Sequence, residues 1–101
     1  MADLILSVKK FWFDEIKTGK KTIEYREVKP YWTKRLNKKF DRVIIVNGYP
    51  KIRDETNSII FPWSGVSVGS LKKDMDFYNQ TVDTLNLDSD DVCIYQIFLK
   101  R

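Results

Sequence analysis

The segment Gly19-Lys20-Lys21-Thr22-Ile23-Glu24-Tyr25-Arg26 marks a change in the hydrophobic period of this 101-residue chain. Just before it, Trp12 and Ile16 lie four positions apart, which is the spacing of one face of a helix. Gly19 stands where a left-handed helix cap is favoured. The sequence therefore predicts a helix over residues 9–18 that ends at this glycine.

After the glycine the pattern alternates, which predicts a strand over residues 21–28. Ile23 and Tyr25 then point to one side of the strand, and Glu24 and Arg26 to the other. Two residues along a strand span about 6.5–7 Å, so the two charged side chains are close enough to interact. Arginine's planar fork suits phosphate or carboxylate, and the glutamate can orient a cation, accept from a base edge or carry a proton. The alternative is a surface ion pair, which contributes little to stability.

Working outward, further apolar runs predict most of the remaining elements. We expect strands over residues 4–8, 43–46, 59–63, 66–68 and 92–99, and a second helix over 31–37 after Pro30. The acidic segment 71–91 is weakly patterned and predicts one or two helical turns at most. Five or six short strands with two N-terminal helices indicate an α+β fold. A curved, partly open β-barrel is favoured because it avoids long exposed strand edges.

Length and composition indicate a single domain over residues 1–101 with a packed core, since 43% of the residues are hydrophobic. The apolar run Leu4–Leu6 is too short for a signal peptide or a membrane span, so we expect a cytoplasmic protein without membrane association. The single cysteine, Cys93, excludes an intrachain disulfide and lies in an apolar run, which predicts burial. The acidic run 88–91 has no regular ligand spacing, and no metal or other cofactor is expected.

Charge is distributed unevenly along the chain. Residues 1–53 hold 14 Lys and Arg against 6 Asp and Glu, whereas residues 54–101 hold 4 against 8. This asymmetry favours an anionic partner for the basic half, such as RNA, DNA, a nucleotide or an acidic protein, over a merely solvated lysine-rich surface. Histidine is absent, so catalysis would have to use lysine, carboxylate, tyrosine or hydroxyl groups, and binding is favoured.

The motif resembles the signature of the ASCH (activating signal cointegrator homology) family, Gly-x-Lys-x-x-Glu-x-Arg, at Gly19, Lys21, Glu24 and Arg26. The similarity to short bacterial and phage members of that family covers residues 3–49. It implies a PUA-like fold, a small curved barrel with helices at its side. It also implies RNA binding through a cleft beside the motif.

On this basis we expect a basic cleft that binds RNA, a nucleotide or a nucleoside. The expected ligand-binding residues lie either in or shortly after the motif, or at the end of a predicted strand. They are Ser7, Lys21, Glu24, Arg26, Tyr31, Arg35, Asn47 and Tyr49. Tyr31, Arg35 and Tyr49 offer stacking surfaces or positive charge. Trp12 and Trp32 are expected in the core, because each lies four positions from an apolar residue.

Two alternatives remain open. Some ASCH proteins hydrolyse the amide of N4-acetylcytidine with a lysine, a threonine three residues later and a downstream glutamate. Lys21 would match that lysine as the catalytic group, with Glu24 as proton carrier. Glu24 stands in the threonine's place, however, and Glu55 is the only glutamate after residue 27. A protein-interaction domain that uses the acidic half and an exposed Trp63 is the other alternative. The sequence leaves the oligomeric state open.

Overall fold

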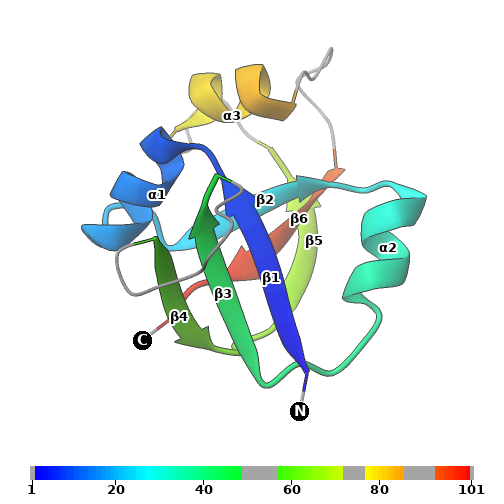
Figure 1. Ribbon diagram of the computed structural model, residues 1–101. Coiled ribbons are helices and arrows are strands. Elements are labelled where there is room, and N and C mark those ends of the chain that lie inside the picture. Colours follow the sequence, from blue (N-terminus) through cyan, green and yellow to red (C-terminus); the bar gives the residue numbers. More distant parts are fainter. Residues whose placement is uncertain (1, 49–56, 72–76, 86–92, 101) are drawn as a thin grey trace. The chain divides into compact units, whose positions relative to one another are not determined.

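The computed structural model describes residues 2–48, 57–71, 77–85 and 93–100 (Figure 1). Within them it has six strands and three helices, which confirms the α+β prediction. In chain order the elements are β1 (Asp3–Val8), α1 (Lys10–Lys17), β2 (Ile23–Glu27), α2 (Pro30–Leu36), β3 (Arg42–Asn47), β4 (Ser58–Pro62), β5 (Val66–Ser70), α3 (Tyr78–Leu85) and β6 (Cys93–Phe98).

The chain divides into two compact units. The first comprises Met1–Ile23, Lys39–Ser64 and Phe98–Arg101, and the second comprises Glu24–Lys38 and Gly65–Ile97. Two three-stranded sheets accompany this division, one of order β1-β3-β4 and one of order β2-β6-β5. Among the residues described, neither sheet closes into a barrel. None of the helices there is long and apolar enough to cross a bilayer.

The sheet of the first unit has β3 at its centre. β1 runs parallel to β3 with Leu6 opposite Ile45, and β4 runs antiparallel with Phe61 opposite Val43. All four side chains are nearly inaccessible to solvent. The continuous β-branched run 43–46 is buried throughout, which confirms the prediction of a strand covered on both faces.

At the start of this sheet the register places Asp3 opposite Arg42. Arg42 donates from Nε and Nη2 to the two carboxylate oxygens of Asp3, at 3.0 and 2.8 Å. These hydrogen bonds, and then the carboxylate's charge, raise the pKa of Arg42 above its ordinary value. The pair is consistent with the register of β1 against β3, in which these two residues are partners.

Helix α1 buries Trp12, Phe13 and Ile16 and packs against β3. The helix ends as the sequence predicts, because Gly19 adopts a φ of +83°, a conformation that glycine reaches without steric cost. The amide of Gly19 donates to the carbonyl oxygen of Ile16 at 3.1 Å. The chain then turns, and the amide of Lys21 donates to the carbonyl oxygen of Glu15 at 3.0 Å.

In the second unit β5 and β6 pair antiparallel, with Ser67 opposite Gln96. The Ser67 hydroxyl donates to Oε1 of Gln96 at 3.0 Å, and a Cβ at Gly69 would come within 2.9 Å of the Gln96 amide nitrogen. Glycine at position 69 thus leaves the space that the Gln96 side chain fills. Helix α3 adds a third helix to the two predicted, in the segment expected to hold one or two turns.

Two predictions about side-chain exposure are wrong. Cys93 was expected to be buried, but it is exposed, because it is the first residue of β6 and lies opposite the exposed Ser70. Trp63 was expected to be exposed, but it is half-buried, with its ring centroid 5.1 Å from that of Phe40.

Candidate functional site

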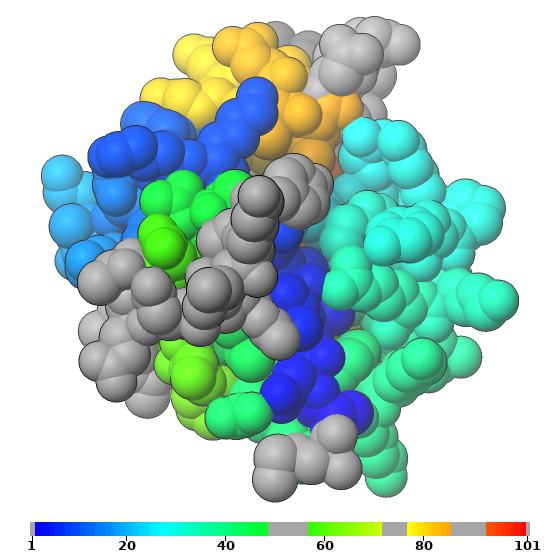
Figure 2. Space-filling view, in the orientation of Figure 1, coloured from blue at the N-terminus to red at the C-terminus, as the bar shows by residue number. Residues whose placement is uncertain are grey.

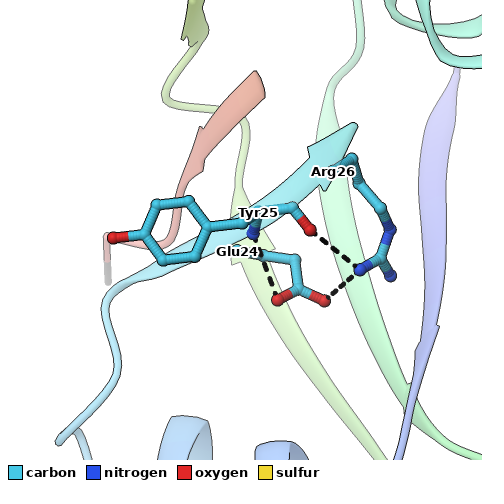
Figure 3. Close-up of polar contacts among 3 residues, drawn as sticks. All are labelled: Glu24, Tyr25 and Arg26. Atoms are coloured by element: carbon cyan, nitrogen blue, oxygen red, sulfur yellow. Dashed lines mark hydrogen bonds and ion pairs between the residues drawn. The ribbon is translucent and has the colours of Figure 1, made fainter. Parts of the chain in front are cut away.

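The charged pair of the motif lies on β2, where Glu24 and Arg26 project from one side of the strand (Figure 3). Nη1 of Arg26 is 2.7 Å from Oε2 of Glu24 and donates also to the carbonyl oxygen of Tyr25 at 3.1 Å. The other carboxylate oxygen, Oε1, accepts from the amide of Tyr25 at 3.2 Å. The two side chains therefore bond the backbone on both sides of Tyr25.

This arrangement closes part of a strand edge. Among the described residues, β2 is an outer strand of its sheet, which has the order β2-β6-β5. An outer strand presents amide and carbonyl groups to which another chain can add. At Tyr25 both groups are bonded to the side chains on either side of it, so this position is closed to strand addition.

The ion pair is buried, in contrast to the surface pair considered from the sequence. The side chains of Arg26 and Glu24 retain only 12% and 3% of their accessible surface. A buried ion pair whose geometry satisfies its hydrogen bonds costs little to keep, but the loss of one partner leaves a desolvated charge. The removal of Glu24 or Arg26 alone should therefore destabilise this part of β2.

Helix α2 follows β2 and begins with Pro30 in its first turn, as predicted. Leu36, at the end of α2, is its buried residue. On the same side of the helix, three positions earlier, the Thr33 hydroxyl lies 2.7 Å from the Tyr95 hydroxyl of β6. These two contacts fix which side of α2 faces solvent.

Four side chains from β2 and α2 form what we call the aromatic–arginine group: Arg26, Tyr31, Trp32 and Arg35. The guanidinium carbons of Arg26 and Arg35 each lie 5.1 Å from the centroid of the Trp32 ring. Both distances are within the range of cation–π attraction, which contributes about 0.5–1 kcal/mol at exposed sites and about 2 when desolvated. Trp32 thus holds two arginines in place.

The exposed end of this group is Tyr31, with 64% of its surface accessible. Its ring meets Trp32 edge-on, with centroids 5.0 Å apart and planes at 82°. Nη1 of Arg35 donates to the Tyr31 hydroxyl at 3.3 Å, and the guanidinium carbon lies 6.0 Å from the Tyr31 ring centroid. The Tyr31 ring is therefore held from two directions while most of its surface meets solvent.

The surroundings of this exposed end are basic. From residue 29 to residue 38 the chain carries four basic residues and no acidic one. Three of the four are exposed lysines and the fourth is half-buried: Lys29, Lys34, Lys38 and Arg35. Lys29 is paired with Glu27 at 3.3 Å. Figure 2 shows the α2 segment at the molecular surface.

Lys21, at the second fixed position of the motif, belongs to the first unit. It is buried there, with 5% of its surface accessible. Its ammonium nitrogen lies 3.7 Å from the centroid of the Trp12 ring, which is itself buried. The core position predicted for Trp12 is confirmed. That Lys21 lines one hollow together with Glu24 and Arg26 stays a prediction.

Comparisons with known protein families, with functionally described proteins and with solved structures find no match for this chain.

The remaining predicted residues lie elsewhere. Ser7 and Asn47 sit at the same end of the sheet of the first unit. Ser7 pairs with Val46 and Asn47 with Val8, so the two side chains project from opposite faces. Tyr49 and Glu55 lie outside the described residues.

Four of the eight predicted ligand-binding residues thus come together in the second unit: Glu24, Arg26, Tyr31 and Arg35. The residue that joins them, Trp32, was expected in the core. The sequence does hold a signal for its role, because Trp32 and Arg35 are three positions apart on one helix and so share a face. The spacing of residues along the chain does not predict the contact between Arg26 and the Trp32 ring.

Proposed function

We propose that the protein is a small RNA- or nucleotide-binding domain of the ASCH type, with the PUA-like, partly open barrel that the resemblance implies. The elements around the motif follow in the order β1, α1, β2. The motif runs from Gly19, at the end of α1, to Arg26 on β2. The described residues hold six strands that could contribute to such a barrel. Cross-strand NOEs that join the two three-stranded sheets at their edges are expected, and two sheets without such NOEs would overturn the barrel.

The observation that carries the binding proposal is the exposed basic side of α2, where the ring of Tyr31 and the guanidinium of Arg35 are held together. A polyanion binds such a surface by releasing counterions, and aromatic rings beside the charges bind bases. The acid-free stretch 29–38 supplies the charge.

Within this proposal the motif residues have a supporting role. Arg26 bonds Glu24 and the Tyr25 carbonyl while it contacts Trp32, so it is engaged within the protein. Ligand contact then belongs to the exposed Tyr31 and Lys34 and to the half-buried Arg35 of α2. Glu24 and Arg26 support the position of these residues through the contact of Arg26 with Trp32.

The binding of a labelled RNA of about 12 nucleotides, within the range of site sizes for single-stranded binding proteins, tests the proposal by fluorescence anisotropy at rising salt. Between about 50 and 200 mM salt, the logarithm of the affinity is expected to fall linearly with that of the salt concentration. Lys34→Ala should weaken binding and make this slope shallower by about 0.7 for one lost phosphate contact.

Lys17→Ala is the matched control, because Lys17 is also an exposed lysine in the last turn of a helix, but of α1. It should leave affinity and slope unchanged. Binding that is insensitive to salt, or equal losses in both variants, would contradict the proposal.

Hydrolysis of a modified nucleoside is the second candidate, and the burial of Lys21 against Trp12 favours it. A lysine in such surroundings can serve as a base or a nucleophile. Glu24 accepts hydrogen bonds from Arg26 and Tyr25, so these bonds would have to open before it carried a proton. Turnover of acylated nucleosides that Lys21→Met abolishes would support hydrolysis; no turnover by the wild-type protein would remove it.

A further inference from the structure

The structure distinguishes between two kinds of surface on α2. A purely cationic surface attracts any polyanion, whether its bases are paired or not. Tyr31 adds an aromatic ring that is 64% exposed and held by contacts with Trp32 and Arg35. An ordered ring with an accessible surface is suited to stack on a flat partner, because little side-chain freedom is left to lose.

Arg35 brings positive charge to the same place. Its guanidinium lies 6.0 Å from the Tyr31 centroid and donates to the edge of that ring, at the hydroxyl. A base and its phosphate are joined through a single sugar. A base that stacks on Tyr31 therefore carries its own phosphate close to the guanidinium fork, which suits phosphate oxygens.

Paired bases do not offer this contact. In an A-form duplex the base faces are covered by neighbouring pairs, and the duplex presents phosphates, 2′-hydroxyls and groove edges. Unpaired bases can be splayed out and stacked on aromatic side chains. Only an unpaired nucleotide can use Tyr31 and Arg35 together.

We propose that Tyr31 and Arg35 form a subsite for one unpaired nucleotide, with the base stacked on the Tyr31 ring and the phosphate on Arg35, so that the ligand class is single-stranded RNA. This inference rests on the proposed function and narrows it. Lys29, Lys34 and Lys38 supply charge that does not distinguish single strands from duplexes.

The test compares an unstructured RNA of about 12 nucleotides with the same strand annealed to its complement, at one fixed salt concentration. The wild-type protein should bind the single strand more tightly. Tyr31→Ala should lower single-strand affinity about tenfold, within the range for losing one stacked base, and leave duplex affinity within about twofold. Tyr31→Phe keeps the ring and should stay within about threefold of wild type on the single strand.

Lys34→Ala is the matched control, because it removes charge next to the subsite without touching the ring, and it should weaken both RNA forms alike. Since Tyr31 is largely exposed, its variants are expected to fold, and circular dichroism checks this. The comparison of the two RNA forms on the wild-type protein is decisive without any variant.

The outcomes separate the two proposals. Equal or tighter binding of the duplex, or unchanged single-strand affinity in folded Tyr31→Ala, would overturn the subsite and leave RNA binding in place. A mononucleotide that binds as tightly as the single strand would overturn single-stranded RNA as the ligand class, and would leave nucleotide binding in place. If neither the single strand nor the duplex shows salt-dependent binding, the proposed RNA binding itself is wrong.

Discussion

Glu24 and Arg26 lie two positions apart on β2, joined by a 2.7 Å ion pair, and between them they bond the amide and the carbonyl of Tyr25. An edge strand usually avoids unwanted pairing through charge, proline or a bulge. Here charged side chains complete the hydrogen bonding of the strand that carries them. The motif therefore supports the local fold, and in our proposal the exposed residues that follow it contact the ligand.

Removal of one partner of this pair should destabilise the protein. Arg26→Leu leaves the Glu24 carboxylate buried without its 2.7 Å partner, and the free energy of unfolding should fall by about 3 kcal/mol in urea denaturation. The double variant Glu24→Leu with Arg26→Leu should recover part of the loss, because both charges are gone. A loss below about 1 kcal/mol in the single variant would mean that the pair behaves as an exposed one.

Trp32 should matter for RNA binding although it offers the ligand no charge. Trp32→Leu removes the ring against which Arg26 and Arg35 lie. The loss of order in Arg35 and Tyr31 should lower RNA affinity about fivefold, equivalent to about 1 kcal/mol of cation–π attraction. Trp63→Leu is the control, since Trp63 is also half-buried but belongs to the first unit. Equal affinities in both variants and in the wild type would contradict this role.

Gly19 should be needed for its backbone conformation. A Cβ at this position would meet nothing within 4 Å, but the φ of +83° is costly for other residues. Gly19→Ala should lower the free energy of unfolding by about 1–2 kcal/mol, and Gly19→Asn by less, because asparagine tolerates the left-handed region. Lys20→Ala, next to it and exposed, should be nearly neutral. Equal stability of Gly19→Ala and wild type would contradict the cap.

Cys93 should react in the native protein. It is exposed at the start of β6, so a thiol reagent such as Ellman's reagent should modify it without denaturant. Cys93→Ser should show no reaction. Modification that required unfolding would restore the buried position expected from the sequence.

The hydrophobic pattern predicts the fold where burial and period agree. The β-branched run of β3 and the i, i+4 pair Trp12 and Ile16 are of this kind, and both lie where expected. Helix α3 is harder to foresee, because its buried residue is Thr81, whose side chain gives no apolar signal. Cys93 was placed wrongly since periodicity does not show which residue begins a strand or that its partner is exposed.

The candidate site illustrates a different limit. Alternation correctly places Glu24 and Arg26 on one side of a strand, but it does not reveal that β2 is an outer strand. The pair bonds the amide and the carbonyl group of Tyr25 on that strand, which alternation does not show either. Likewise, the meeting of Arg26 with Trp32 depends on how α2 packs beside β2, which no local spacing encodes.

The most direct test of the account is an NMR titration of the ¹⁵N-labelled protein with single-stranded RNA. We expect the amide shifts to concentrate in residues 29–38 around α2, with smaller changes at Glu24 and Arg26, and to fade as salt rises. Shifts centred on α1 and the sheet β1-β3-β4, with α2 unaffected, would contradict it.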